Sequence, residues 1–215
     1  MRSLAILAVV LAISGLSYQI TSQQLIQAVN KARTNPVYYA NQIASLYTSK
    51  GVKGTSNDAL CYQEAENFLR SMKALPALKE SIAADLAAWK HSNWMSTTKT
   101  FSHTGLSGST PKTRLEAVGT WTSGMGYTEN IAYYSAAVPA ETFVIMWLTD
   151  CGISTRGHRN NIMTTTAPFL GCGESGMYVT CDGAKDLTLL PSITAATLQQ
   201  AGLSTAVNGA GYTGV

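Results

Sequence analysis

Apolar residues recur every three or four positions in five segments, which is the spacing of helices that bury one face. The segments are residues 23–30, 37–46, 63–75, 81–95 and 138–148. Ser22 can cap the first helix, Pro36 interrupts the chain between the first two, and Pro139 occupies a first-turn position that helices tolerate. The pattern therefore predicts a protein with several amphipathic helices.

A strand pair is predicted over residues 169–181, because Glu174-Ser175-Gly176 is a turn signal between two strand-like runs. Residues 171–176 also match GxGxxG, but they open no helix, so we interpret them as a hairpin turn rather than a dinucleotide site. Residues 96–125 are polar and Gly-rich and are expected to be mostly loop. The balance of several helices around a small sheet indicates an α+β fold with helices layered on the sheet.

The N-terminus has the three parts of a secretory signal peptide. Arg2 precedes an apolar run from Leu4 to Ile13, and the small-x-small sequence Gly15-Leu16-Ser17 follows. We expect residues 1–17 to be removed and the mature protein to be extracellular. The alternative is a membrane anchor, but the run is shorter than the ~20 residues that an anchor prefers, so no stable membrane insertion is expected.

Composition indicates a globular domain without a strong electrostatic partner. Hydrophobic residues make up 46% of the 215 residues and charged residues 13%, and the net charge is +3 without a Lys/Arg block. This argues for a sizeable core and against nucleic acid as a partner. Residues 183–215 contain only two charges, Lys185 and Asp186, and many small residues, so we expect a loosely packed tail after a domain spanning residues 18–182.

Four cysteines remain in the mature chain, which in a secreted protein suggests two disulfides among three possible pairings. The predicted hairpin would bring Cys172 and Cys181 together. By elimination, Cys61 and Cys151 form the other favoured pair. The alternative is that some of the four are free buried thiols.

The candidate chemistry lies in two histidines and two acids. The chain has neither an HExxH helix nor a GxSxG elbow, and of its three histidines His91 falls on a helix, where a packing role is expected. His103 lies in a Gly/Ser-rich loop and His158 follows Arg156-Gly157, with Glu129 and Asp150 between them. These four side chains could converge on a divalent cation such as zinc, or form a hydrogen-bonded cluster without metal.

Several motifs in order resemble the CAP superfamily of cysteine-rich secretory, antigen 5 and pathogenesis-related 1 proteins, in the SCP-domain variety of bacteria and simple eukaryotes. They are Asn30-x-x-Arg33-x-x-Pro36, His103-Thr104-Gly105, Gly108-Ser109-x-Pro111-x-x-Arg114, Glu129-Asn130-Ile131-Ala132 and Arg156-Gly157-His158-Arg159-x-Asn161-Ile162. The resemblance runs from about Leu25 to Cys181.

The resemblance implies an α-β-α sandwich with a small, mostly antiparallel sheet. It also implies a cleft that holds two histidines and two acids and that binds zinc or another divalent cation in some members. His103, His158 and Glu129 match three of the four positions, and Asp150 replaces the usual Glu. Because Asp is one methylene shorter, this departure favours an indirect, hydrogen-bonding role for Asp150.

Three functions are compatible with these residues. The first is a secreted, non-enzymatic binding module with a weak cation site, whose partner is an extracellular protein or a small apolar ligand. The second is a metal-assisted peptidase or esterase in which His103 and His158 hold zinc and Glu129 acts as the base. The third is a structural protein of the cell wall or matrix.

Neighbouring residues are expected to have structural roles. We expect Arg159 to pair with an acid of the fold itself, and Asn130 and Asn161 to hydrogen-bond buried backbone near the cluster. The four tryptophans are expected to lie in the core.

Overall fold

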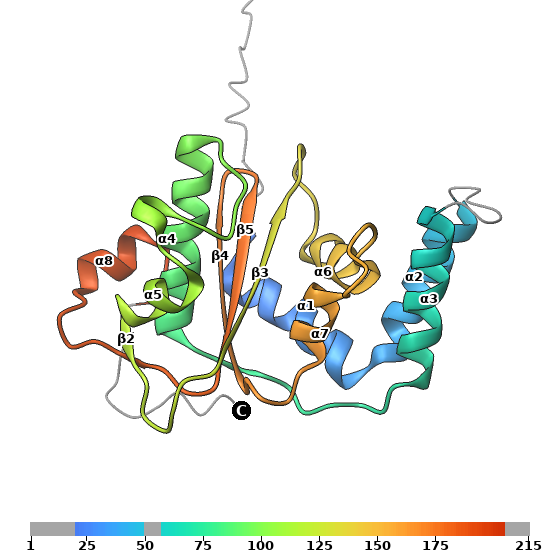
Figure 1. Cartoon of the computed structure of the whole chain (residues 1–215), viewed down its shortest axis with the longest axis horizontal. Helices are drawn as coiled ribbons and strands as arrows, with labels where there is room; N and C mark the ends of the chain where they lie inside the picture. Colours follow the sequence, from blue (N-terminus) through green and yellow to red (C-terminus); the bar gives the residue numbers. More distant parts are fainter. Residues whose placement is uncertain (1–19, 50–56, 205–215) are drawn as a thin grey trace, which may run out of the picture.

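The computed structural model describes residues 20–49 and 57–204, so the predicted signal peptide and residues 205–215 lie outside it. A four-stranded sheet in the order β1-β4-β5-β3 separates two groups of helices (Figure 1). The helices are α1 Ser22–Thr34, α2 Pro36–Ser49, α3 Asn57–Ser71, α4 Ile82–Thr98, α5 Pro111–Glu116, α6 Ala140–Thr149, α7 Gly157–Met163 and α8 Ala195–Gln200. The strands are β1 Lys79–Glu80, β2 Gly119–Thr120, β3 Tyr127–Tyr133, β4 Phe169–Ser175, β5 Tyr178–Ala184 and β6 Thr188–Leu189. The expected α-β-α sandwich is confirmed.

The centre of the sheet is the predicted hairpin. β4 and β5 are antiparallel and turn at Gly176, whose φ of +63° suits glycine. Cys172 and Cys181 lie directly opposite each other and form a disulfide, and the second disulfide joins Cys61 to Cys151. Both favoured pairings are therefore confirmed.

The GxGxxG segment has a packing role on the face that α4 covers. A Cβ on Gly171 would lie 2.1 Å from the backbone nitrogen of Asp85, and one on Gly173 would lie 2.3 Å from that of Trp89. Both contacts are too short for any side chain. These glycines therefore let the helix backbone rest directly on β4, and the motif serves the hairpin and this close approach.

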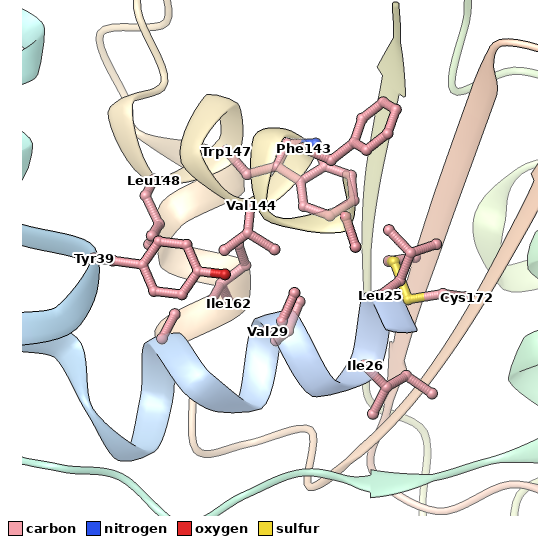
Figure 2. Packing of buried hydrophobic residues seen from close by; sticks show 14 of the residues in the cluster. Leu25, Ile26, Val29, Tyr39, Phe143, Val144, Trp147, Leu148, Ile162 and Cys172 are labelled. Atoms are coloured by element: carbon pink, nitrogen blue, oxygen red, sulfur yellow. A yellow bond between two sulfur atoms is a disulfide. The ribbon is translucent and has the colours of Figure 1, made fainter. Parts of the chain in front are cut away.

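The larger core lies on the other face of the sheet, where α1 and α6 pack together. Figure 2 shows Val144 and Leu148 of α6 on the side facing α1, which presents Leu25 and Val29, and all four side chains are at most 1% exposed. Tyr39 of α2 lies in the same core. The helical periodicity thus predicted the correct buried faces.

The prediction of a loosely packed tail over residues 183–215 is wrong for residues 183–204, the part that the structure describes. Residues 183 and 184 complete β5, β6 pairs with β2, and α8 places Leu198 at 2% exposure against Leu86, Leu115 and Val118. Low charge and small residues suggested a loose tail. The few apolar residues, however, fall where they cover the outer surface of α4.

Four further elements, α5, β2, β3 and α7, were not predicted from the sequence. The 96–125 region contains the end of α4, the short helix α5 and strand β2. Strand β3 and helix α7, which carry site residues, were not assigned either. None of the helices within residues 20–49 and 57–204 is long and apolar enough to cross a bilayer.

Candidate functional site

One half of the site is built around Glu129 on β3. His103 Nδ1 lies 2.6 Å from Glu129 Oε1, and Arg114 of α5 donates to Oε2. Arg114 also donates 3.0 Å hydrogen bonds to the backbone oxygens of His103 and Ser109. The Glu129 side chain is 2% exposed and that of His103 is 52% exposed. The loop after α4 therefore holds the His103 imidazole at the surface, against the buried carboxylate of Glu129.

The other half joins α6 to α7. His158 Nδ1 lies 2.8 Å from Asp150 Oδ1, and the His158 backbone nitrogen donates to Asp150 Oδ2 over 3.0 Å. Asp150 is the αL cap residue of α6, with φ 48°, and its side chain is 2% exposed. Its carboxylate thus fixes both the ring and the backbone of His158, the indirect role that the shorter side chain favours.

The two halves meet beside β3. The ring centroids of His103 and His158 are 6.4 Å apart and their planes are inclined by 22°. Because side chains alternate along a strand, Glu129 contacts His103 while Asn130 donates to the backbone oxygen of His158 over 3.0 Å. The structure therefore brings all four predicted residues together, as two imidazole–carboxylate pairs.

The neighbouring polar residues have the structural roles expected of them. Asn161 donates to the Glu129 backbone oxygen over 3.1 Å and to Asn130 Oδ1 over 2.9 Å. Arg159, 2% exposed, pairs with Glu64 of α3. Of the tryptophans, Trp147 is 2% exposed and donates to the Ile131 oxygen, whereas the other three are only partly buried.

Three residues of the site have roles that the sequence did not reveal. Arg114 belongs to one of the family motifs, but the sequence indicated no role for its side chain. His91 Nε2 donates to the Ser102 oxygen over 2.9 Å and so anchors the residue before His103. Asp182, fully buried, lies opposite Glu129 in the β3–β5 register. The predicted strand pair ends at residue 181, so the sequence did not place Asp182 in the sheet.

Burial and neighbouring charges perturb these groups. Burial alone would raise the pKa of Glu129, but the His103 hydrogen bond and the Arg114 charge outweigh it, so its pKa lies below the usual value. Burial, together with the charge of Glu129, raises the pKa of Asp182 well above its usual range. Burial, together with the charge of Arg114, lowers the pKa of His91. The pKa values of these two neighbouring carboxyl groups, Glu129 and Asp182, are thus shifted in opposite directions.

Among the four site residues, only the two histidines offer an atom that is free to bind a cation. A carboxylate at Nδ1 fixes the Nδ1–H form of an imidazole and leaves Nε2 as a lone-pair donor, the arrangement seen around many metal-bound histidines. Within residues 20–49 and 57–204, no three His, Cys, Asp or Glu side chains are arranged to hold one ion. Glu129 and Asp150 therefore orient the rings in this geometry and do not complete a four-residue ligand set.

An apolar pocket of about 460 Å³ adjoins His158, within the usual size range of small-molecule sites. Its walls are Phe101, Ile131, Ala132, Tyr133, Met146, Trp147, Asp150, Cys151, Ile153, His158 and Tyr178. Of the ten large apolar side chains that are exposed in the described residues, four line this pocket: Phe101, Tyr133, Met146 and Ile153. Exposed apolar area is therefore concentrated next to the histidine pair.

An α-β-α sandwich with two imidazole–carboxylate pairs at one edge of its sheet defines the class of protein. The model of the cysteine-rich secretory protein (CAP) family matches residues 26–185, about three quarters of the chain. The chain therefore belongs to the CAP family.

Solved structures give weaker likenesses. An extracellular SCP-domain protein from Bacillus anthracis str. Ames is 27% identical over 52% of this chain, with a TM-score of 0.43, and the match spans 35% of that protein. An outer surface protein from Borrelia burgdorferi is 18% identical over 62% of this chain and 96% of its own, with a TM-score of 0.42. A search of curated proteins gives no match.

Proposed function

We propose that this CAP domain is a secreted, non-enzymatic binding module. Its cleft holds a divalent cation such as zinc between His103 and His158, and the adjoining pocket takes a small apolar ligand or an apolar side chain of an extracellular partner. The observation that carries the proposal is the matched pair of imidazoles, each with Nδ1 bonded to a buried carboxylate and the two rings 6.4 Å apart.

The geometry supports a weak and open cation site. Zinc binds an imidazole nitrogen at about 2 Å, so the His103 and His158 rings, whose centroids lie 6.4 Å apart, would move closer together to bind one ion through Nε2. Two protein ligands leave the remaining positions of a tetrahedral ion to water or to a group of a bound molecule. Such a site exchanges its ion readily and would use the cation to organise the cleft and to bind a ligand.

The same contacts disfavour the metal-assisted hydrolase. A general base needs a carboxylate oxygen that can take a proton from water. Both oxygens of Glu129 are occupied by His103 and Arg114, and its lowered pKa makes it a weak base. Asp150 is likewise occupied at both oxygens by His158.

Secretion is supported by the cysteine chemistry and by the N-terminal pattern. The four cysteines form two disulfides, which persist in oxidising compartments. The apolar run that follows Arg2 provides the export signal.

Calorimetric titration of the oxidised protein with zinc tests the cation site. We expect one site with weak affinity in the parent protein, and loss of that site in both His103→Ala and His158→Ala at unchanged melting temperature. Binding of zinc by both variants as tightly as by the parent, or no binding by the parent, would contradict the site.

A second measurement separates the pocket from the cation. Binding of an apolar fluorescent probe should survive His103→Ala, because His103 does not line the pocket, and should weaken in Met146→Asp, which places a charge in its wall. EDTA-sensitive turnover of peptide or ester substrates would contradict a non-enzymatic role.

A further inference from the structure

The segment that precedes His158 is held by helix α3, which supplies none of the residues lining the pocket. Residues 150–156 connect α6 to α7, and both Asp150 and Arg156 adopt left-handed backbone conformations, with φ of 48° and 53°. Such conformations are uncommon for residues other than glycine and persist only where surrounding contacts stabilise them. The contacts in this case come from α3.

Glu64 of α3 is the centre of those contacts. Its Oε2 lies 2.7 Å from Arg156 Nε, and its two oxygens lie 2.5 and 3.0 Å from Nη1 and Nη2 of Arg159. One carboxylate thus binds two guanidinium groups that stand on either side of Gly157 and His158 in the sequence.

The two arginines in turn hold the backbone around Asp150. Arg156 Nη1 donates to the Asp150 and Ile153 oxygens over 2.8 and 2.9 Å. Arg159 Nε donates to the Leu148 oxygen over 2.5 Å. Glu64 is therefore connected through two side chains to the residue whose carboxylate fixes His158.

The same face of α3 makes two more contacts with this region. Cys61, three residues before Glu64, forms the disulfide with Cys151, and Phe68, four residues after it, lies 5.0 Å from the guanidinium carbon of Arg159. Residues at this spacing share one side of a helix. Because Arg159 is 2% exposed, removal of the Glu64 charge would leave a buried guanidinium without its partner.

We propose that Glu64 is a positioning residue for the histidine site: through Arg156 and Arg159 it holds Asp150 where the Asp150 carboxylate can orient the His158 ring. Its side chain is 46% exposed and touches neither histidine. The cation-affinity part of the test rests on the proposed function, whereas the ring-orientation part does not.

Nitrogen NMR of the histidine rings tests the proposal without metal. The chain has only three histidines, so each ring can be followed separately. At about pH 8, where an ordinary histidine is neutral, we expect His158 in the parent protein to be in the Nδ1–H form. In Glu64→Gln it should become a mixture of both tautomers, while His103, which depends on Glu129 and Arg114, stays unchanged.

Glu66→Gln is the matched control, since Glu66 lies on the same helix and pairs with Arg70 at 2.9 Å. It should change neither ring. Zinc affinity should fall about tenfold in Glu64→Gln, as is usual when support behind a ligand is removed, and should stay at the parent value in Glu66→Gln. If Glu64→Gln does not fold, Arg156→Met, which leaves the Arg159–Glu64 pair intact, should produce the same change at His158.

The outcomes are distinct. An unchanged His158 ring in folded Glu64→Gln, or equal changes at His158 and His103, overturns the positioning role. A change confined to His158 in a protein that binds no zinc supports the positioning role and refutes the proposed cation site.

Discussion

The packing of the C-terminal segment predicts a specific cost for Leu198→Ala. Leu198 is 2% exposed and contacts the apolar cluster on α4 and α5. Leu→Ala at buried sites costs about 2–5 kcal/mol, from the lost transfer free energy and the cavity left behind. Because α8 is only six residues long and Leu198 is its one buried residue, it can relax into the space, so we expect the lower part of that range, about 2–3 kcal/mol.

Urea unfolding of the oxidised protein measures this cost. For a protein of this size the loss corresponds to a fall in melting temperature of roughly 4–12 °C. Gln199→Ala, at the exposed neighbouring position, is the control and should remain within about 0.5 kcal/mol of the parent protein. A loss below about 0.5 kcal/mol for Leu198→Ala would show that α8 contributes nothing to the fold and that the segment is the loose tail its composition suggests.

Three other predictions concern the sheet and the disulfides. Burial raises the pKa of Glu174 to about 6 from 4.5, so the fold prefers the neutral acid and the free energy of unfolding falls as the pH rises through this window. In paired urea titrations, Glu174→Gln should therefore be more stable than the parent protein by about 1–2 kcal/mol at pH 8 and equal to it at pH 4. Gly173→Ala should lower the free energy of unfolding by more than about 3 kcal/mol or prevent folding, because the added Cβ would meet the α4 backbone. Gly157→Ala, whose Cβ would have its nearest neighbour 3.8 Å away, should remain within about 1 kcal/mol of the parent protein, and similar melting temperatures for the two variants would contradict the close approach of α4 to β4. Replacing Cys61 and Cys151 by alanine, which opens a loop of 90 residues, should cost about 4.6 kcal/mol, against about 2.6 kcal/mol of loop entropy for the 9-residue loop of Cys172 and Cys181; an equal loss from opening either loop would argue against the entropic origin.

Local pattern was sufficient where each element carries its own signal. The five amphipathic segments correspond to helices, and the Glu174-Ser175-Gly176 turn correctly predicted the hairpin and, through it, both disulfides. The residues that decided the helices and the hairpin lie within one turn of helix or one hairpin of each other, whereas the Cys61–Cys151 pair, 90 residues apart, followed by elimination.

The missed elements depend on contacts between distant parts of the chain. β3 places Glu129 and Asn130 in a buried strand, which alternation rules disfavour, and Arg114, His103 and Asn161 satisfy them from other elements. β1 has two residues and pairs in parallel with β4, 90 residues away. No local signal could report either arrangement.

For the site itself, the family motifs identified the four side chains but not how they are paired. Spacing along the chain could not show that each acid would take an imidazole Nδ1. It also could not identify Glu64 as the acid that meets Arg159, because the two are 95 residues apart. Only the folded chain shows which groups are left to bind a ligand.

The two histidine rings are carried by opposite layers of the sandwich, His103 by the loop after α4 and His158 by α7 beside α6. Strand β3 lies between them and holds both, through the Glu129 carboxylate on the His103 ring and through the Asn130 amide on the His158 backbone oxygen. A molecule that binds both rings would therefore bridge the two helical layers across the edge of the sheet.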